Sequence, residues 1–458
     1  MKELLILSGL GVASLILEII NLRKLILPII MLGLIACIVV CLFDFNNPEN
    51  VYDMLFVDNS ALIITIILCF TTLCWFAMNL EEFKQNEKII PDFTTLIMFS
   101  LAGAYILSTY INFTMMFLGV EILSIPMYIL AGSNRKNIYS NEAAYKYLIM
   151  GAFASSFLLL GIAFIYGSTA TFDIRQIVMS TMSPKLNVQL YMIGVLLILF
   201  ALAFKVAVIP FHFWAPDVYS GTPTQITAYM STVVKVAAIA AFFRLFVMAF
   251  GMISPVFKDI VLLLGVLSVV FGNLLAVGQS NVKRMLAYSG ISHAGFMFLA
   301  ISVVNKQTTN ATLYYMASYA LSGIALFWVV IEMNKLKLAT ISDYKGLIQR
   351  NGLLTFTLVL SMLSMAGIPP LAGFIAKYNV LIQIFSVKNI SIALLAIFGS
   401  LVAVYYYFKL IISSVQNSDT ETNPEKIQLS ILSKIFLILL NLSIILLGVF
   451  SNIIIKYT

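Results

Sequence analysis

Long apolar runs recur along the whole chain, and they limit what it can fold into. Cutting the sequence at clusters of charged or turn-forming residues leaves fourteen apolar segments, most of them close to the ~20 residues that an α-helix needs to cross a bilayer. They are 4–20, 25–42, 60–80, 93–110, 113–131, 143–166, 188–209, 223–250, 260–277, 285–304, 312–333, 352–385, 391–412 and 432–455. The sequence therefore predicts an all-α polytopic membrane protein with about fourteen transmembrane helices.

The composition agrees with a chain that lies mostly in lipid. Of its 458 residues, 61% are hydrophobic and only 10% are charged, against roughly 25% charged residues in ordinary soluble domains. So few charged side chains could not cover a soluble globule, which excludes soluble enzymes. The cysteines Cys37, Cys41, Cys69 and Cys74 lie in apolar segments without a CxxC or Cys/His pattern, so we predict neither a metal site nor a disulfide.

The basic residues predict which side of the membrane each loop faces. The net charge of +7 comes from lysines and arginines scattered between apolar segments, so positive-inside topology explains it better than nucleic-acid binding. Loops after odd-numbered segments hold fourteen of them. The opposite side holds only Lys2, Arg175, Lys185, Arg244, Lys258, Lys306, Lys388 and Lys456. We therefore expect the first side to be cytoplasmic and both termini to face outward, with the first segment retained as a helix because no small-residue cleavage site follows it.

Two segments cannot be simple membrane-spanning helices. Segment 352–385 has 34 residues and contains GIPPLAGF; its helical length would be about 51 Å, against a ~30 Å hydrocarbon core. Residues 209–223 spell IPFHFWAPDVYSGTP. Proline and glycine at this density cannot keep the helical hydrogen bonds, and irregular backbone at membrane depth occurs only inside protein or beside a water-filled cavity.

Two broken helices five segments apart indicate an inverted repeat of five helices, as in transporters. We expect an N-terminal three-helix segment over residues 1–90, a first antiporter-like repeat over 91–250, a second repeat over 251–414 and a C-terminal helix within 415–458. Two proline kinks of purely structural origin are the alternative.

A few charged side chains fall inside apolar segments, where a charge at the centre of a helix costs at least ~2.5–3.5 kcal/mol. Glu121 is the only acid near the centre of a segment, and it needs a cationic partner. Lys205, five residues before Pro210, is the natural candidate. Such a pair is either a static strut or a proton carrier, since a lysine desolvated by burial can release its proton near neutral pH.

The other lysines inside segments divide into central and peripheral ones. Lys377 follows the second break much as Lys205 precedes the first. Lys235 has no acidic neighbour in the sequence and is predicted to be a central relay. Lys146 and Lys409 lie near segment ends, where a flexible side chain can also reach the membrane interface.

The only two histidines, His212 and His293, lie among these lysines in the sequence. Histidine titrates near neutral pH and can pass protons between lysines, but a hydrogen-bonded core histidine is an equal alternative. Asp217, in the first break, is expected to cap backbone groups or to pair locally.

The motifs PFHFWAPDVYSGTPT, KRMLAYSGISHAGF and GIPPLAGFIAK, with the segments around Glu121 and Lys235, resemble the antiporter-like membrane subunits of respiratory complex I over nearly the whole chain. The resemblance implies that Glu121, Lys205, Lys235 and Lys377 are the key protonatable residues, with His293 and Lys146 as accessory ones; we add His212 from its place in the break. Lysine at position 377 resembles the N and L branches rather than the M branch or sodium/proton antiporter subunits, and the N branch matches best.

This resemblance implies a proton-translocating subunit of NADH:quinone oxidoreductase in a bacterial inner membrane. Quinone reduction elsewhere in the complex would drive protons outward along the buried Glu, Lys and His residues. No cofactor is expected in this chain; quinone, NADH, FMN and iron–sulfur clusters are expected in partner subunits. The expected partners are neighbouring antiporter-like and small membrane subunits and membrane lipid, with no nucleic acid. A cation/proton antiporter subunit, a membrane-hydrogenase subunit and a purely structural subunit are the alternatives.

Overall fold

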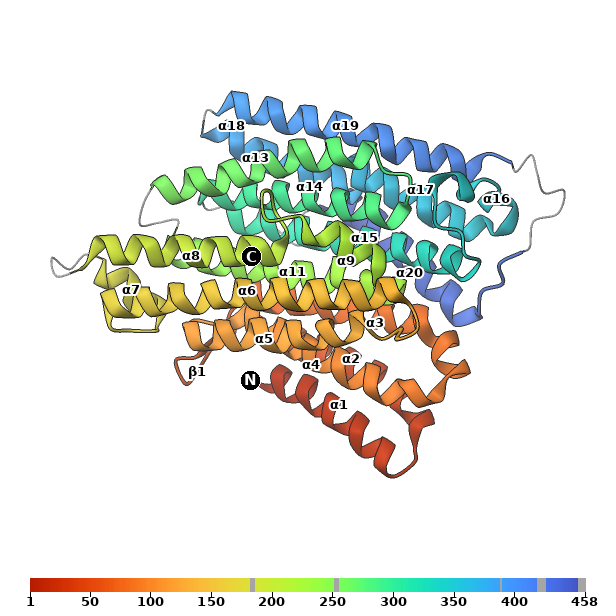
Figure 1. Ribbon diagram of the computed structural model, residues 1–458, viewed down its shortest axis with the longest axis horizontal. Helices are drawn as coiled ribbons and strands as arrows, with labels where there is room; N and C mark the ends of the chain where they lie inside the picture. Colours follow the sequence, from red (N-terminus) through yellow and green to blue (C-terminus); the bar gives the residue numbers. More distant parts are fainter. Residues whose placement is uncertain (182–185, 251–254, 306, 388, 418–425, 452–458) are drawn as a thin grey trace. The chain divides into compact units, whose positions relative to one another are not determined.

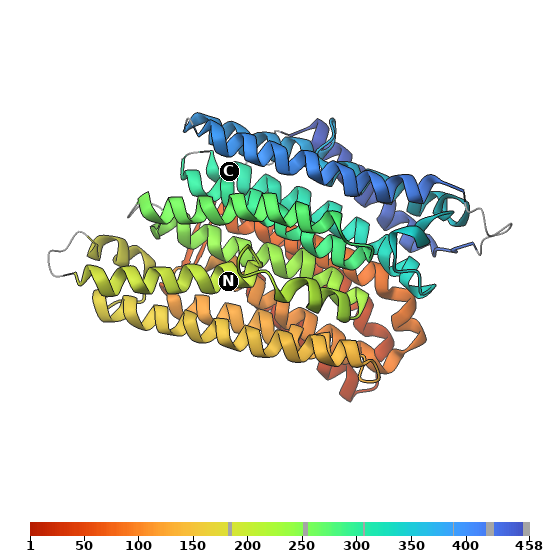
Figure 2. The same ribbon diagram turned by 45° about the horizontal axis from the view of Figure 1, so that its top comes forward.

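The structure is a computed structural model, and it describes residues 1–181, 186–250, 255–305, 307–387, 389–417 and 426–451 (Figures 1 and 2). Lys185, Lys306, Lys388 and Lys456, which were used to predict the topology, and the last residues of segment 432–455 lie outside these ranges. Twelve helices in the described ranges are long and apolar enough to cross a membrane, and Gly352–Ala366 is a shorter apolar helix. The all-α polytopic membrane fold is thereby confirmed, whereas the count of fourteen and the five-helix repeats stay predictions.

The chain forms two compact units, which are described separately. The predicted division into an N-terminal segment, two repeats and a C-terminal helix stays a prediction.

The first unit comprises residues 1–207 and 233–260. Its helices are α1 (Lys2–Ile19), α2 (Ile26–Phe43), α3 (Asn59–Gln85), α4 (Ile90–Thr109), α5 (Phe113–Ala131), α6 (Ile138–Thr169), α7 (Ile174–Ser180), α8 (Val188–Val206) and α11 (Lys235–Leu245), with short 3₁₀ turns at Arg23–Leu25 and Glu87–Ile89. One antiparallel hairpin, β1 (Glu49–Val51) and β2 (Leu55–Val57), stands between α2 and α3. The α11 helix is almost entirely buried and packs on α3, α4 and α8.

Two glycines let α6 and α8 lie against each other, as their ribbons show in Figure 1. A Cβ built on Gly161 would lie 2.9 Å from the carbonyl oxygen of Gly194, and one on Gly194 would lie 2.9 Å from that of Gly161. No side chain fits at that distance, so only glycine allows this close approach, as is typical of membrane helix pairs.

The second unit comprises residues 208–232 and 261–458. Its helices are α9 (Trp214–Gly221), α10 (Thr224–Tyr229), α13 (Pro255–Val277, from residue 261 onward), α14 (Val282–Val303), α15 (Thr308–Lys335), α16 (Leu347–Arg350), α17 (Gly352–Ala366), α18 (Ala372–Ser386), α19 (Ile390–Val415) and α20 (Ile431–Val449), with a 3₁₀ turn η5 at Ile341–Tyr344. The apolar stretch of α15 is entirely buried, and α10, α14, α17, α18 and α20 pack around it. This helix is the core of the second unit.

Many helices begin at an asparagine whose side chain caps the first turn. Asn112 accepts a hydrogen bond from the backbone N–H of Thr114 at 2.9 Å, and Asn351 accepts one from that of Leu354 at 3.1 Å. Asn137, Asn187 and Asn281 cap α6, α8 and α14 in the same way. Each cap satisfies an N–H group that the first helical turn leaves free.

Both predicted interruptions are confirmed. The α8 helix ends at Val206, Ala207 takes a left-handed conformation, and the chain is helical again from Trp214. The α17 helix ends at Ala366, where Gly367 has a φ of +86° and the N–H of Ile368 donates to the carbonyl of Leu363 at 3.0 Å. This is a glycine C-cap of the Schellman type, and Pro369 and Pro370 then prevent the helix from resuming before Ala372.

The segment 223–250 contains an irregularity that the sequence did not predict. Two π-helical turns, Met230–Val234 and Phe246–Phe250, flank α11. Lys235 is the first residue after the earlier turn. Such π-turns are rare and are frequent at functional sites.

Candidate functional site

Lys205 in the last turn of α8 reaches hydroxyl groups on α5. Its Nζ donates to Ser124 Oγ at 3.1 Å and to Tyr128 Oη at 2.9 Å, and it lies 5.5 Å from the centre of the Tyr128 ring. Ser124 and Tyr128 are four residues apart and so share one face of α5. The ammonium is half-buried and solvated by protein hydroxyls rather than by a carboxylate.

Glu121 lies one turn before Ser124 on α5 and is also half-buried. It accepts a short hydrogen bond, 2.5 Å, from Ser155 Oγ on α6. No ion pair within 4.0 Å joins Glu121 to Lys205 in the described part of the chain, so the prediction of direct pairing is wrong. The physical reason is that each charge has its own hydroxyl partners: Ser155 for Glu121, and Ser124 and Tyr128 for Lys205.

A small cavity borders Lys205 inside the first unit. Its volume is about 10 Å³, and it is lined from α11 and its preceding turn by Ala238 and Val234 and from α6 by Tyr147. This is close to the least volume that holds one water molecule. Lys235, next to Val234 in the chain, is only 2% exposed. Glu121, Lys205 and Lys235 thus belong to one unit, with a small and mostly apolar cavity beside Lys205.

Lys377 on α18 is buried beside the broken end of α17 in the second unit, with 7% of its surface exposed. Its Nζ donates to the carbonyl of Ala366 at 2.9 Å, and it lies 5.4 Å from the centre of the Phe296 ring. Ala366 is the last residue of α17, so the ammonium meets the negative end of a helix. A Cβ on Gly367 would lie 3.0 Å from Lys377 Cδ, so an added side chain would crowd the lysine, and the positive φ of Gly367 also favours glycine.

His293 on α14 links several hydroxyl groups in the same unit. One ring nitrogen, Nδ1, lies 2.9 Å from Tyr315 Oη, and the other, Nε2, lies 3.0 Å from Tyr407 Oη. Tyr407 Oη also lies 2.5 Å from Ser289 Oγ. The Tyr315 ring stacks on Phe296, the ring beside Lys377. His293 is therefore hydrogen-bonded in the core and is part of a buried polar chain.

Sequence reasoning missed the hydroxyl partners of these charges. Tyrosine and serine are common in apolar segments, and their partners are far apart in the chain: Lys205 and Ser124 are 81 residues apart. The one local signal is the recurrence of tyrosine at helical spacing, as at Tyr315 and Tyr319.

The remaining predicted residues lie in different surroundings. His212, in the first interruption, is 5% exposed beside the ring of Phe213, and its Nδ1 has no hydrogen-bond partner in the described residues. Asp217 on α9 forms an ion pair at 3.1 Å with Arg284 on α14, so its partner lies far along the chain rather than nearby in the sequence. Lys146 is 40% exposed and pairs with Glu142 on the same helix at 2.7 Å.

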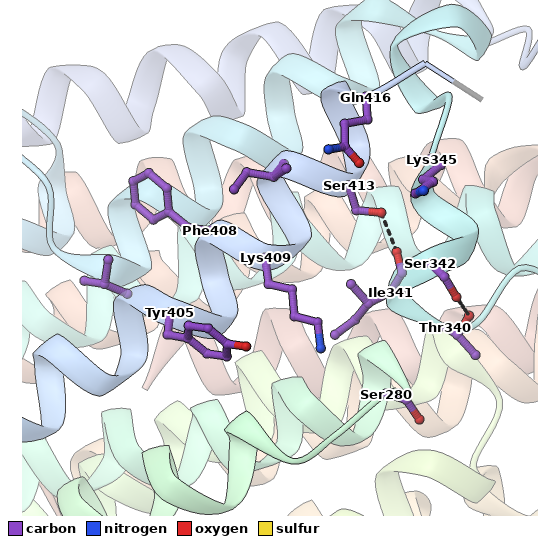
Figure 3. Close-up of a pocket in the computed structure, with 12 residues that line it drawn as sticks. Ser280, Thr340, Ile341, Ser342, Lys345, Tyr405, Phe408, Lys409, Ser413 and Gln416 are labelled. Atoms are coloured by element: carbon purple, nitrogen blue, oxygen red, sulfur yellow. Dashed lines mark hydrogen bonds between the residues drawn. The ribbon is translucent and has the colours of Figure 1, made fainter. Parts of the chain in front are cut away.

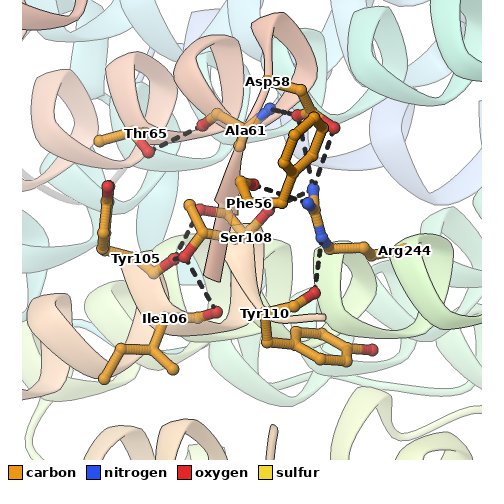
Figure 4. Close-up of polar contacts among 10 residues, drawn as sticks. Phe56, Asp58, Ala61, Thr65, Tyr105, Ile106, Ser108, Tyr110 and Arg244 are labelled. Carbon is orange, nitrogen blue, oxygen red and sulfur yellow. Dashed lines mark hydrogen bonds and ion pairs between the residues drawn. The ribbon is translucent and has the colours of Figure 1, made fainter. Parts of the chain in front are cut away.

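Arg244 was expected in an outer loop, and the structure corrects this. It lies in α11 with 6% of its surface exposed (Figure 4). Its guanidinium donates to the carbonyls of Phe56, Ser108 and Tyr110 at 2.7–2.9 Å and forms an ion pair with Asp58 at 3.3 Å. Arginine has five N–H donors, and these carbonyl and carboxylate partners allow the charged guanidinium to be buried there.

Outside the membrane-spanning segments, Arg175 at the start of α7 joins two acids. It lies 2.8 Å from Asp173 and 3.0 Å from Asp53. Burial tends to raise the pKa of Asp173, but hydrogen bonds from the side chain and backbone of Arg175 outweigh burial and lower the pKa below its usual value. Hydrogen bonds from Asn50 and then Arg175 lower the pKa of Asp53.

The chain is similar to known membrane proteins over most or all of its length. Residues 111–403 match the family described as NADH:quinone oxidoreductase/Mrp antiporter, TM. The chain is 41% identical to NADH-quinone oxidoreductase subunit N of Cytophaga hutchinsonii, over 100% of this chain and 99% of that protein. A chain of respiratory complex I from Thermus thermophilus superposes with a TM-score of 0.85 at 29% identity, over 99% of this chain and 98% of that chain. A chain of the Mrp complex from Dietzia shares the fold, with a TM-score of 0.89 at 18% identity over 100% of this chain and 96% of that chain.

Proposed function

Because this chain belongs to the NADH:quinone oxidoreductase/Mrp antiporter family of membrane subunits, within its NADH-quinone oxidoreductase subunit N branch, we propose that it moves protons across the membrane as a subunit of that oxidoreductase. It is a multi-pass protein of the bacterial inner membrane, and it works beside other membrane subunits of the complex. The complex as a whole is the enzyme. NADH, FMN, iron–sulfur clusters and quinone belong to partner subunits, and this chain is assigned no redox site.

The observation that carries the proposal is that each unit buries a lysine beside irregular helical backbone: Lys235 after a π-turn, and Lys377 at the broken end of α17. A buried ammonium is costly in a low-dielectric interior, so the energy difference between its charged and neutral forms is small compared with that in water. A modest change in nearby charge is then enough to make it take up or release a proton.

The residues divide the work as follows. Lys205 on α8, with Glu121 on α5, sets the charge near Lys235 in the first unit. Lys377 and His293, with its tyrosine partners, continue the path in the second unit, and Lys146 and His212 are accessory. Each proton moved against 100 mV costs ~2.3 kcal/mol, so redox chemistry elsewhere in the complex must act on the charge states of these groups rather than open a pore.

The test asks whether the lysines must release their protons. Arginine keeps the charge but stays protonated throughout a physiological cycle. We expect Lys377→Arg and Lys205→Arg to impair NADH-driven proton uptake by membrane vesicles about as badly as the alanine variants, per assembled complex. Lys434→Arg, an exposed lysine on α20, is the matched control and should pump normally.

Near-normal pumping by both arginine variants would contradict the carrier role and favour fixed charges. Full activity in the alanine variants would favour a purely structural subunit. Transport that requires sodium and proceeds without NADH would favour the antiporter alternative.

A further inference from the structure

The second unit contains a groove with no assigned role. Its volume is about 560 Å³, and it lies between α19 and the bridge that pairs Asn281 with Thr340 (Figure 3). Two hydrogen bonds fix its walls: Ser413 Oγ donates to the carbonyl of Ile341 at 2.7 Å, and the N–H of Gly346 donates to the carbonyl of Gln416 at 2.8 Å. A cavity of this size suits a small ligand or one lipid headgroup.

Two exposed lysines line the groove, Lys409 from α19 and Lys345 from the turn after η5. Neither forms an ion pair or hydrogen bond through its side chain in the described part of the chain. The nearby Asp343 is already engaged, because its carboxylate accepts the backbone N–H groups of Ala339 and Thr340 at 3.0 and 2.8 Å. The lining of the groove therefore contains two lysines and no acidic side chain.

The rest of the lining combines hydroxyl groups with apolar side chains. Ser280, Thr340, Ser342 and Tyr405 offer hydroxyls near the lysines, whereas Val404, Phe408 and Ile412 form an apolar wall on α19. Lys409 and Tyr405 extend from α19 toward the side on which Ile341 and Ser280 lie (Figure 3). Because Lys409 lies within a membrane-spanning helix, an unneutralised charge there is unfavourable.

We propose that this groove binds one anionic phospholipid, with its phosphate at Lys345 and Lys409 and its acyl chains along the exposed apolar face of α19. Basic pockets between membrane helices suit such headgroups. A free phosphate would leave the apolar wall unused, which is why the groove favours a lipid. The proposal does not depend on proton translocation.

The test uses the whole complex in nanodiscs of phosphatidylglycerol and phosphatidylcholine. A photoreactive benzoylphenylalanine replaces Phe408 in the groove or, as the reference, Leu401, which is 66% exposed on the same helix. After illumination, mass spectrometry gives the ratio of phosphatidylglycerol to phosphatidylcholine adducts. Each lysine near an anionic group is worth roughly a five-fold enrichment, so the ratio at position 408 should exceed that at 401 by about that factor or more.

Variants of the lysines identify the cause. Lys345→Gln with Lys409→Gln should bring the ratio at 408 down to the value at 401, while Lys337→Gln, an exposed lysine outside the groove, should leave it unchanged. Equal ratios at 408 and 401, no lipid adduct at 408 when 401 is labelled, or adducts to a peptide of another subunit would each overturn the proposal. All measurements are made on purified assembled complex.

Discussion

At the scale of single residues, the charges in the first unit are held by hydroxyl groups. Ser155 donates to Glu121, and Lys205 donates to Ser124 and Tyr128. Hydroxyls solvate a charge without fixing its protonation state, whereas a direct ion pair would stabilise both charged forms. This arrangement suits groups that change charge during a cycle.

Lys205 donates to Ser124, which lies three residues after Glu121 on α5, so the two charges can be coupled without direct contact. We expect Glu121→Gln and Lys205→Gln each to reduce proton uptake more than the double variant does, because each single change leaves an uncompensated charge. A double-mutant cycle on proton uptake, per assembled complex, measures the coupling. Strictly additive losses would argue that the two groups act independently.

Gly367 offers a residue test of the broken helix. Gly367→Ala places a side chain at φ +86° and 3.0 Å from Lys377 Cδ, and the left-handed conformation alone costs about 1–2 kcal/mol. We expect reduced thermal stability and reduced proton uptake. Gly352→Ala, at the other end of α17 and with nothing within 4 Å of the added Cβ, should change neither. Unchanged pumping in Gly367→Ala would mean that the position of Lys377 is not critical.

At the scale of elements, Arg175 at the start of the short α7 helix forms ion pairs with Asp53, in the turn of the hairpin, and with Asp173. The pKa of Asp173 is lower in the folded chain than the ordinary value near 3.9. The contact with Arg175 therefore stabilises the fold at pH values above the ordinary pKa of aspartate. This contribution is lost as the pH falls through the lowered pKa of Asp173.

The expected outcome concerns the difference between wild type and Arg175→Gln. The variant should be less stable at pH 7, and this deficit should shrink as the pH falls below the ordinary aspartate pKa and through the lowered pKa of Asp173. Thermal unfolding of the complex at pH 7 and at acidic pH measures it, with Arg135→Gln, in the loop before α6, as the control. A deficit that is constant with pH would contradict the ionic explanation.

At the scale of the whole molecule, topology follows from the loops rather than from the helices. Of the lysines and arginines that the sequence assigned to loops, fourteen lie on one predicted side and seven on the other once Arg244, which lies inside α11, is left out, so we expect both termini to face outward. A reporter fused at Thr458 should be active only outside the cytoplasm, and one inserted after Lys337 should behave oppositely. A reporter at Thr458 that is active in the cytoplasm would refute this orientation.

Much of the fold could be predicted from the sequence because the information is local. A membrane helix satisfies its backbone hydrogen bonds within itself, so an apolar run of sufficient length already predicts it. Pro210 and the Gly367-to-Pro370 stretch interrupt helices for equally local reasons, since proline lacks an N–H and glycine tolerates positive φ. A charge inside an apolar run, such as Lys235 or Lys377, is visible in the same way.

The tertiary structure alone decided which groups surround those charges. Arg244 was expected in a loop, yet carbonyls from residues more than a hundred positions away hold it inside the first unit. Glu121 was expected to pair with Lys205, yet its carboxylate accepts a hydrogen bond from Ser155 on α6. Side-chain partners depend on how helices pack and rotate against one another, and the hydropathy of a segment does not specify that rotation. The sequence determined where the chain crosses the membrane and where it breaks, and packing determined what each buried charge touches.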